Sequence, residues 1–474
     1  MGTTPPSTET LDAAAIHRLS TVIQGKVLAP GDLAYDEART VYNAMIDKHP
    51  ALIAQCRDVA DVIAAVRFAR EQDLPLAIRG GGHSGAGLGS VDDGLVIDLR
   101  DMHGVRVDPD ALTVRVEGGA TLGEVHHTTE AFGLVTPSGI ISTTGVGGIT
   151  LGGGLGHLTR QFGLAIDNLL EADVVLADGS FVTVSETQHP DLFWALRGGG
   201  GNFGVVTSFV FRLHPLSHLT AGPMLWPLQQ AGEVLRWYRE VIATAPDALS
   251  GFFAFMTVPP GPPFPEALWG EQVCGIVWSY TGDDPASTFA PIRAQFGPPV
   301  LDWVGPMTHS ALNTMFDGLY PSGDQWYWKA DFVTELPDEA IDIHLRYAAS
   351  LPTWKSTMHL YPINGAASRV ANDATAWNAR NATWGMVMVG VSPDPADNTR
   401  MIDWARSYWQ ELHPFSTGGA YVNMMMEEGA DRVRAVYGDN YERLAHVKAT
   451  YDPDNLFRIN QNILPAQQIA QPER

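Results

Sequence analysis

The chain has 474 residues, 45% hydrophobic and 18% charged, a composition typical of a soluble globular protein with more than one hydrophobic core. Its 30 basic and 53 acidic side chains leave a formal net charge of −23, which argues against nucleic acid or an anionic membrane as a partner. No stretch approaches the ~20 apolar residues that span a bilayer, so no membrane partner is expected.

The N-terminal residues 1–12 are polar and rich in threonine and proline, which predicts a disordered tail. This start has no basic region followed by an apolar run, so we expect no secretory signal and a cytoplasmic location. Only Cys56 and Cys274 are present, too few for a disulfide framework or a thiolate zinc site. We therefore predict no metal centre.

Residues 13–215 read as short strands and helices separated by glycine-rich loops. Asp58 is a predicted N-cap for a helix with apolar residues on one face, flanked by strands over 51–56 and 74–79. Residues 171–185 are two β-rich runs joined at Asp178-Gly179, which predicts a hairpin. Residues 189–213 then predict a helix, a glycine loop and a strand.

From residue 216 to 415 glycine clusters become rarer and tryptophan more frequent. Strands are predicted over 272–282, 329–336, 356–363 and 385–392, with a helix over 338–351. This pattern predicts a second domain with an antiparallel sheet backed by helices. The last segment, 416–474, contains a predicted helix over 441–451. The fold class is therefore α+β.

The strongest indication of function is a set of three glycine clusters, at residues 80–89, 145–156 and 198–204. Two of them contain G-x-G-x-x-G, but the first runs into a strand, and the second follows a helix and precedes a strand. A dinucleotide fold needs the order strand, glycines, helix, so nicotinamide-dependent chemistry is disfavoured. Successive backbone N–H groups in such loops can instead hold a phosphate.

His83 lies inside the first glycine cluster, in the sequence RGGGHS. An imidazole fixed there can be a structural hydrogen-bonding group. Against a cofactor it can also act as a base, a donor or, when neutral, a nucleophile.

Four segments in order, IRGGGHSGAG (78–87), GVGGITLGGGLGHLTRQFGLAIDN (145–168), DLFWALRGGGGNFGVVT (191–207) and YDPDNLFRINQNI (451–463), resemble the berberine bridge enzyme-like oxidases. These belong to the vanillyl-alcohol oxidase flavoprotein superfamily. The resemblance implies a two-subdomain, PCMH-type FAD-binding domain over 13–215, a substrate domain over 216–415, and a C-terminal segment, 416–474, that completes the FAD domain.

The resemblance also implies a FAD cofactor covalently bonded through the methyl carbon beside the flavin's benzenoid ring, with His83 as the attachment residue. The implied cofactor-binding residues are Arg79, Gly80, Gly81, Gly82, His83, Ser84, Gly87, Leu88, Thr143, Thr144, Gly147, Gly148, Gly153, Gly154, His157, Val206 and Asn460.

Three positions depart from the family pattern. Ile141 stands where many relatives carry a second flavin-linking cysteine, so a single histidyl link is expected. Gly85 replaces a frequent tyrosine, which predicts extra room or mobility. The usual YxNY motif is YVNM, in which Tyr421 and Asn423 remain and Met424 replaces the tyrosine that acts as base in relatives oxidising sugars and alcohols.

The sequence therefore does not identify the catalytic base, because a thioether cannot accept the hydroxyl proton of an alcohol. Tyr421 is a candidate base or a substrate-positioning group, and Lys329 and His359 are further candidates with plausible structural roles. An amine substrate needs no strong base. The residues 326–328 are expected to form a wall of the pocket.

Thr144, just before GVGG, occupies the position that controls dioxygen access in the family. Its small size favours an oxidase that oxidises a small organic alcohol, sugar or amine by hydride transfer to the flavin and releases hydrogen peroxide. A dehydrogenase using another acceptor and a non-catalytic flavin- or ligand-binding protein are the alternatives.

Overall fold

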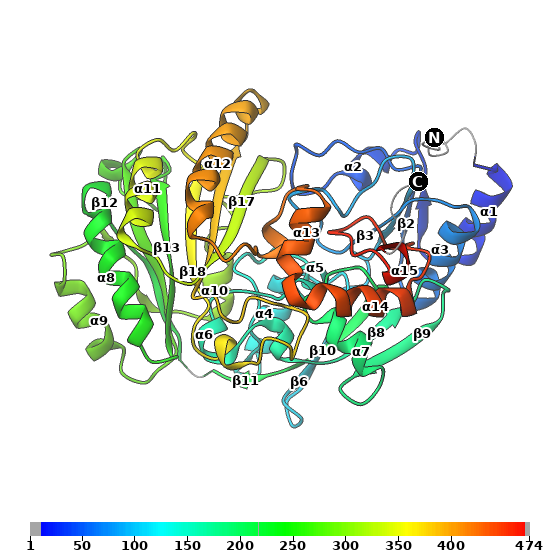
Figure 1. The fold of residues 1–474 in the computed structure, drawn as a ribbon, viewed down its shortest axis with the longest axis horizontal. Coiled ribbons are helices and arrows are strands. Elements are labelled where there is room, and N and C mark those ends of the chain that lie inside the picture. Colours follow the sequence, from blue (N-terminus) through cyan, green and yellow to red (C-terminus); the bar gives the residue numbers. More distant parts are fainter. Residues whose placement is uncertain (1–10, 217, 470–474) are drawn as a thin grey trace.

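The computed structural model describes residues 11–216 and 218–469, which form two lobes (Figure 1). The tail predicted for residues 1–12 lies outside the described residues except for its last two. Of these, Asp12 caps the first helix, because its carboxylate accepts a hydrogen bond from the Ala14 N–H at 3.0 Å. None of the described helices is both long and apolar enough to cross a membrane.

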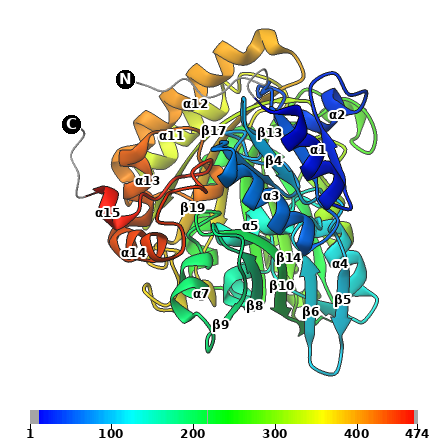
Figure 2. The same cartoon turned by 90° about the vertical axis from the view of Figure 1, so that its right-hand side faces the viewer.

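The first lobe contains two main sheets (Figure 2). One has the order β1 (Lys26–Leu28), β2 (Leu52–Gln55), β4 (Leu95–Asp98), β3 (Leu76–Arg79), in which β4 is parallel to both neighbours. The other has the order β5 (Val105–Asp108), β6 (Thr113–Glu117), β10 (Val205–Arg212), β8 (Leu169–Val175), β9 (Phe181–Ser185). The short strands β7 (Leu134–Val135) and β11 (His214–Pro215) pair separately. Its helices are α1 (Ala13–Val22), α2 (Tyr35–Arg39), α3 (Val59–Glu71), α4 (Leu122–Glu130), α5 (Val146–Leu151), α6 (Thr159–Phe162) and α7 (Pro190–Leu196).

Local sequence signals explain several of these elements. Helix α3 begins after Asp58, whose carboxylate accepts from the Asp61 N–H at 3.0 Å. Strands β8 and β9 form the predicted antiparallel hairpin, and Gly179 in its turn has φ +75°. The predicted order of helix, glycine loop and strand is also confirmed, as α7, residues 197–204 and β10.

The second lobe is built on a large antiparallel sheet. Its order is β15 (Leu301–Asp302), β12 (Thr220–Pro227), β14 (Gln272–Tyr280), β13 (Leu249–Thr257), β18 (Thr357–Pro362), β19 (Trp384–Ser392), β17 (Gln325–Val333), and β16 (Gly305–Pro306) also pairs with β12. Strands β12 and β13 lie outside the predicted strands. The helices of this lobe are α8 (Ala231–Thr244), α9 (Pro285–Ala294), α10 (His309–Thr314), α11 (Asp338–Ala348) and α12 (Asn398–Leu412). The predicted α+β class, with an antiparallel sheet backed by helices, is confirmed.

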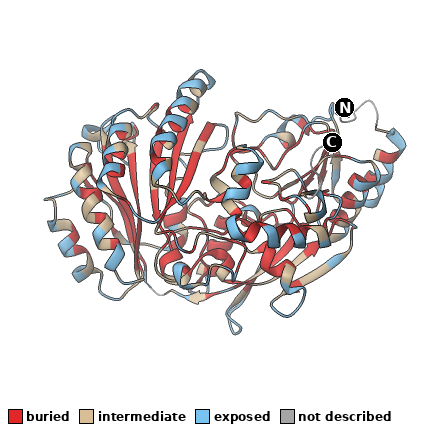
Figure 3. Ribbon diagram, in the orientation of Figure 1, coloured by how far each residue is buried: buried red, intermediate tan, exposed pale blue. Residues whose placement is uncertain are grey.

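Both faces of the large sheet are buried, as the red strands in Figure 3 show. On β13, Phe253 and Phe255 belong to a core shared with α8, α11 and α12. The alternate residues Phe252 and Ala254 belong to a core shared with the first lobe. The period of two along a strand therefore separates a helix-facing side from a lobe-facing side.

The chain returns to the first lobe after α12. Helices α13 (Ala430–Tyr437), α14 (Tyr441–Tyr451) and α15 (Ala466–Ile469) lie there, and α14 packs on α7 and α15 (Figures 1 and 2). The exact domain limits at residues 215 and 415 stay predictions.

Candidate functional site

The loop after β3 places His83 in a polar and aromatic setting. The Tyr42 ring stacks on the imidazole, with ring centroids 3.9 Å apart and an interplanar angle of 17°. The Thr143 hydroxyl lies 3.0 Å from Nε2, and the Thr144 hydroxyl lies 3.4 Å from Nδ1. Burial lowers the pKa of His83 to about 4. The imidazole is therefore neutral near pH 7, as a nucleophile requires.

The same loop is anchored by a buried ion pair. Arg79, at the end of β3, donates to the Asp98 carboxylate on β4 at 3.0 Å and to the Thr40 carbonyl at 3.2 Å. Both charged side chains are 1% exposed. Asp98 also pairs with Arg100. The charge of Arg79 is thus already compensated before any ligand binds.

A cavity of about 410 Å³ extends from this loop to the large sheet of the second lobe. Among the described residues that line it, Arg79 is the one charged side chain. Any phosphate in the cavity must therefore be held mainly by backbone N–H groups, which glycine loops supply.

The glycines of the clusters divide into two classes. Some let two backbones touch: a Cβ on Gly81 would lie 2.3 Å from the Gly145 nitrogen. Others face open space: a Cβ on Gly148 or on Gly201 would meet no protein atom within 4 Å, although both residues line the cavity. The second class leaves room for a ligand against bare backbone, which fits a flavin cofactor.

The C-terminal segment closes the cavity from the first-lobe side. The Asn202 side chain donates to the Gln461 carbonyl at 3.2 Å and accepts from the Ile463 N–H at 2.9 Å. Asn460 donates to the Gly201 carbonyl at 3.2 Å, and its buried Oδ1 has no partner within the part of the chain that the structure describes. A buried acceptor of this kind fits a ligand that donates a hydrogen bond.

The opposite wall comes from alternating residues of the large sheet. Trp326 and Trp328 line the cavity, whereas the intervening Tyr327 does not, so the expectation that all three form the wall is wrong for Tyr327. Its hydroxyl accepts instead from Arg406 at 2.9 Å. The extra room predicted at Gly85 is also absent, because a Cβ there would lie 2.4 Å from the Trp328 ring. Trp328, on strand β17, fills that space.

Lys329 is on the same side of β17 as Tyr327, away from the cavity. Its Nζ is 2.6 Å from the Glu428 carboxylate and 4.7 Å from the centre of the Trp409 ring. The period of two along the strand causes this, because Trp328 already occupies the cavity side. The structure therefore does not bring Lys329 to the site.

His359, on β18, does line the cavity. Its Nδ1 lies 2.6 Å from the Tyr361 hydroxyl, two residues along the same strand face. Burial lowers the pKa of His359 to about 3 and raises that of Tyr361. Both side chains are therefore neutral near pH 7.

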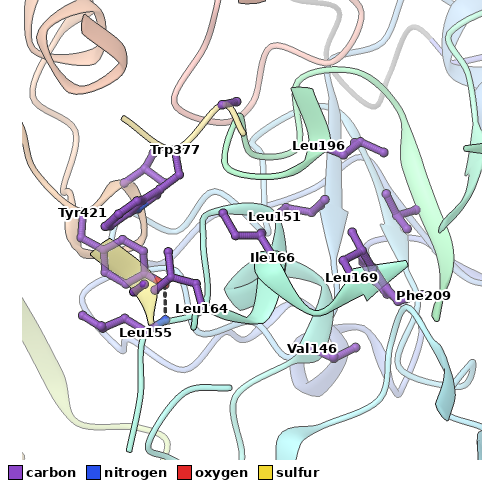
Figure 4. Close-up of a cluster of buried hydrophobic side chains, with 14 of the residues drawn as sticks. Val146, Leu151, Leu155, Leu164, Ile166, Leu169, Leu196, Phe209, Trp377 and Tyr421 are labelled. Carbon is purple, nitrogen blue, oxygen red and sulfur yellow. Dashed lines mark hydrogen bonds between the residues drawn. The ribbon is translucent and has the colours of Figure 1, made fainter. Parts of the chain in front are cut away.

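Tyr421 is held by several donors, of which Figure 4 draws the contact with Leu155. Its oxygen accepts from the Gly154 N–H at 2.9 Å, the Leu155 N–H at 3.3 Å and the Asn423 side chain at 3.0 Å. Burial raises the pKa of the phenol. A neutral phenol whose lone pairs are already engaged is a poor acceptor for a substrate proton, so the geometry favours a positioning role.

The structure brings most of the predicted cofactor residues to one cavity. Those that line it are Arg79, Gly80, Gly81, Gly82, His83, Ser84, Leu88, Thr144, Gly147, Gly148, Val206 and Asn460, together with Tyr421 and His359. Outside the lining are Gly87, Thr143, Gly153, Gly154, His157 and Lys329. Of these, Thr143 contacts His83 and Gly154 contacts Tyr421.

Several lining residues were not predicted, notably Tyr42, Phe252, Tyr320 and Tyr361. They are ordinary aromatic residues on separate elements, and no local motif distinguishes them. Asn202 lies inside the third glycine cluster, which was the one available signal for it.

This fold, with its glycine-lined cavity and C-terminal closing segment, defines a class of FAD-linked oxidoreductases. The family described as "FAD binding domain" matches residues 50–185, and that described as "Berberine and berberine like" matches residues 420–464.

Relatives match along nearly the whole chain. The FAD-linked oxidoreductase YgaK of Bacillus subtilis (strain 168) is 32% identical, covering 94% of this chain and 98% of its own. The (R)-6-hydroxynicotine oxidase of Paenarthrobacter nicotinovorans is 30% identical, covering 94% and 97%. The crystal structure of 6-hydroxy-D-nicotine oxidase from Arthrobacter nicotinovorans superposes with a TM-score of 0.83 at 27% identity, covering 94% and 98%. The chain therefore belongs to the berberine bridge enzyme-like family of FAD-linked oxidoreductases.

Proposed function

We propose that the protein is an oxidase whose FAD is bonded covalently through His83 alone, and that it oxidises a small organic alcohol, sugar or amine with dioxygen as the final acceptor and hydrogen peroxide as a product. The observation that carries this proposal is a neutral imidazole at the edge of a cavity lined by bare glycine backbone. FAD bound there supplies the hydride acceptor. Ile141 also lines the cavity and has no nucleophilic atom, which supports a single link.

The chain's own residues have distinct roles in this proposal. Thr143 and Thr144 hold the His83 ring in one orientation, and Tyr42 covers its face. Backbone around Gly148 and Gly201 leaves space for the cofactor, and Asn460 offers it an acceptor. The relatives supply the substrate classes, since two of them are named for oxidation of 6-hydroxynicotine and of xylooligosaccharides.

The covalent link is tested by the intact mass of the denatured polypeptide after expression with ample riboflavin. We expect the mass of the chain plus one FAD, and His83→Ala should retain flavin that denaturation releases. His446→Gln, a change at an exposed histidine, is the control and should keep the added mass. A wild-type mass equal to that of the amino acids alone would falsify the covalent link.

A dehydrogenase of the same fold is the second candidate, because oxygen use depends on the surroundings of Thr144 in the cavity. Turnover under air with and without an artificial electron acceptor separates the two. An oxidase releases peroxide in stoichiometric amounts without the acceptor. A dehydrogenase turns over only when the acceptor is present.

A further inference from the structure

A short segment between α2 and β2, residues 42–45, runs along the loop that carries His83, and we call this segment the strap. The backbone N–H of its first residue donates to the Gly82 carbonyl at 3.1 Å. The Asn43 side chain donates to the Gly85 carbonyl at 2.8 Å. These two carbonyls flank His83 in the sequence, so the strap holds the loop on both sides of the imidazole.

The strap is also bonded to the second lobe. The Asn43 side chain donates to the Trp326 carbonyl and accepts from the Trp326 N–H, both at 3.0 Å. The Tyr42 hydroxyl donates to the Tyr320 carbonyl at 2.6 Å. The strap therefore connects the loop that carries His83 to the large sheet of the second lobe.

Asn43 is the side chain that joins these contacts. It is 1% exposed, and its oxygen also accepts from the Met45 N–H at 3.0 Å. Its two donor and two acceptor positions are therefore all engaged, in a geometry that a shorter or apolar side chain does not reproduce. The neighbouring Tyr42 lines the cavity and stacks on the imidazole, whereas Asn43 does not belong to the described residues of the lining. Asn43 can therefore influence the cofactor only through the segments that it holds.

The covalent bond proposed for His83 depends on the orientation of its ring. The imidazole exchanges its N–H proton for the flavin methyl carbon, the methyl group loses one hydrogen, and the two electrons and two protons released reduce one dioxygen to hydrogen peroxide. The bond forms only when a ring nitrogen is aimed at the methyl carbon, and small misplacements of reacting atoms slow such steps strongly. Binding of the cofactor against glycine backbone does not require this alignment.

We propose that Asn43 is a positioning residue. By fixing the loop against the second lobe it sets the orientation of the His83 ring, so that formation of the covalent bond depends on Asn43 whereas flavin binding does not. This inference rests on the proposed function, since it concerns the attachment of the cofactor to His83. It adds the second lobe to the parts of the chain that control attachment.

Acid precipitation of the purified protein separates covalent flavin, which stays in the pellet, from flavin that is released. Asn43→Ala should retain most of the total FAD of the wild type, with a covalent fraction lower by about fivefold or more, because the ring is no longer aligned. Asn43→Ser, which keeps a donor and an acceptor on a shorter side chain, serves if Asn43→Ala does not fold, with the same expected pattern. A wild-type covalent fraction in the folded variant would overturn the proposal.

Asp61→Ala is the matched control for a purely structural effect. Asp61 is 1% exposed and lies in the same lobe, outside the cavity lining. It accepts from the N–H groups of Gln24, Gly25 and Arg57 at 2.7, 2.9 and 3.0 Å. Its loss also leaves buried polar groups without partners, so stability should fall as in Asn43→Ala, but the covalent fraction should keep its wild-type value. An equal fall of the covalent fraction in both variants contradicts a positioning role.

A second measurement keeps this inference separate from the proposed function. If the wild type carries FAD without a covalent link, the proposed function fails. The position of His83 is then followed by its rate of carbethoxylation with diethyl pyrocarbonate, read by peptide mass relative to the exposed His446. Asn43→Ala should raise this rate ratio severalfold, because the Tyr42 ring no longer covers the imidazole. An unchanged ratio would overturn the positioning role in that case too.

Discussion

Gly147 and Gly148 are neighbours in sequence but have different surroundings. A Cβ on Gly147 would lie 3.1 Å from the Gly118 carbonyl oxygen, so this glycine allows close backbone packing. A Cβ on Gly148 would enter the cavity without meeting any protein atom within 4 Å. A substitution at Gly148 is therefore expected to affect cofactor binding without affecting the stability of the fold.

Gly148→Ala should leave the thermal stability of the cofactor-free protein nearly unchanged and reduce flavin incorporation severalfold, because the methyl group occupies space that the cofactor needs. Flavin absorbance per polypeptide, measured at matched expression, checks this. Gly305→Ala is the control, since a Cβ there also meets nothing within 4 Å but lies outside the cavity lining. Equal flavin content in both variants would argue that Gly148 does not contact the cofactor.

At the scale of elements, α14 connects the C-terminal segment to the third glycine loop. The Lys448 ammonium, fully buried, lies 2.6 Å from the Asp452 carboxylate and donates to the Asn202 and Phe457 carbonyls at 2.7 and 2.9 Å. Asp452 in turn accepts from the N–H groups of Leu456 and Phe457. One ion pair thus joins a helix, a loop and the segment that carries Asn460.

Lys448→Met should lower the free energy of unfolding by about 3–5 kcal/mol, because it leaves the Asp452 carboxylate buried and unpaired. Denaturant unfolding measures this. The matched control is Arg70→Ala, which removes the exposed ion pair with Asp454 and should cost less than about 1 kcal/mol. If Lys448→Met lowers the free energy of unfolding no more than Arg70→Ala does, the buried Lys448–Asp452 ion pair does not have the stabilising role assigned to it.

At the scale of the whole molecule, neutral histidines are buried throughout both lobes. Burial lowers the pKa of His157 and His344 to about 3 and that of His309 to about 4. In the unfolded chain these groups titrate near 6.5. The unfolded chain therefore binds more protons than the folded protein below that pH, and acid destabilises the fold.

Between pH 6.5 and 5.5 these three histidines should together lower the free energy of unfolding by about 3 kcal/mol. Urea unfolding at the two pH values measures the change. His309→Asn should reduce the measured difference by about 1 kcal/mol, whereas His446→Gln, at an exposed position, should not. An unchanged difference in His309→Asn would show that burial does not hold His309 neutral.

Local sequence signals predicted several elements whose backbone is marked by a cap, a turn or a glycine cluster. Asp58, Asp178-Gly179 and the helix before residues 198–204 all took their expected places. Strands β12 and β13 lack such marks. Their continuous apolar runs reflect burial on both faces, and that burial depends on the other lobe and the helices.

The sequence by itself determined the family, the α+β class and the glycine loop that carries His83, because these depend on residues close together in the chain. Only the tertiary structure decided which side chains face the cavity. Strand alternation directs Trp328 toward Gly85 and Lys329 away from it, and the folding back of the C-terminal segment places Asn460 against Gly201. Contacts between residues so far apart in sequence arise from packing, which no local pattern specifies.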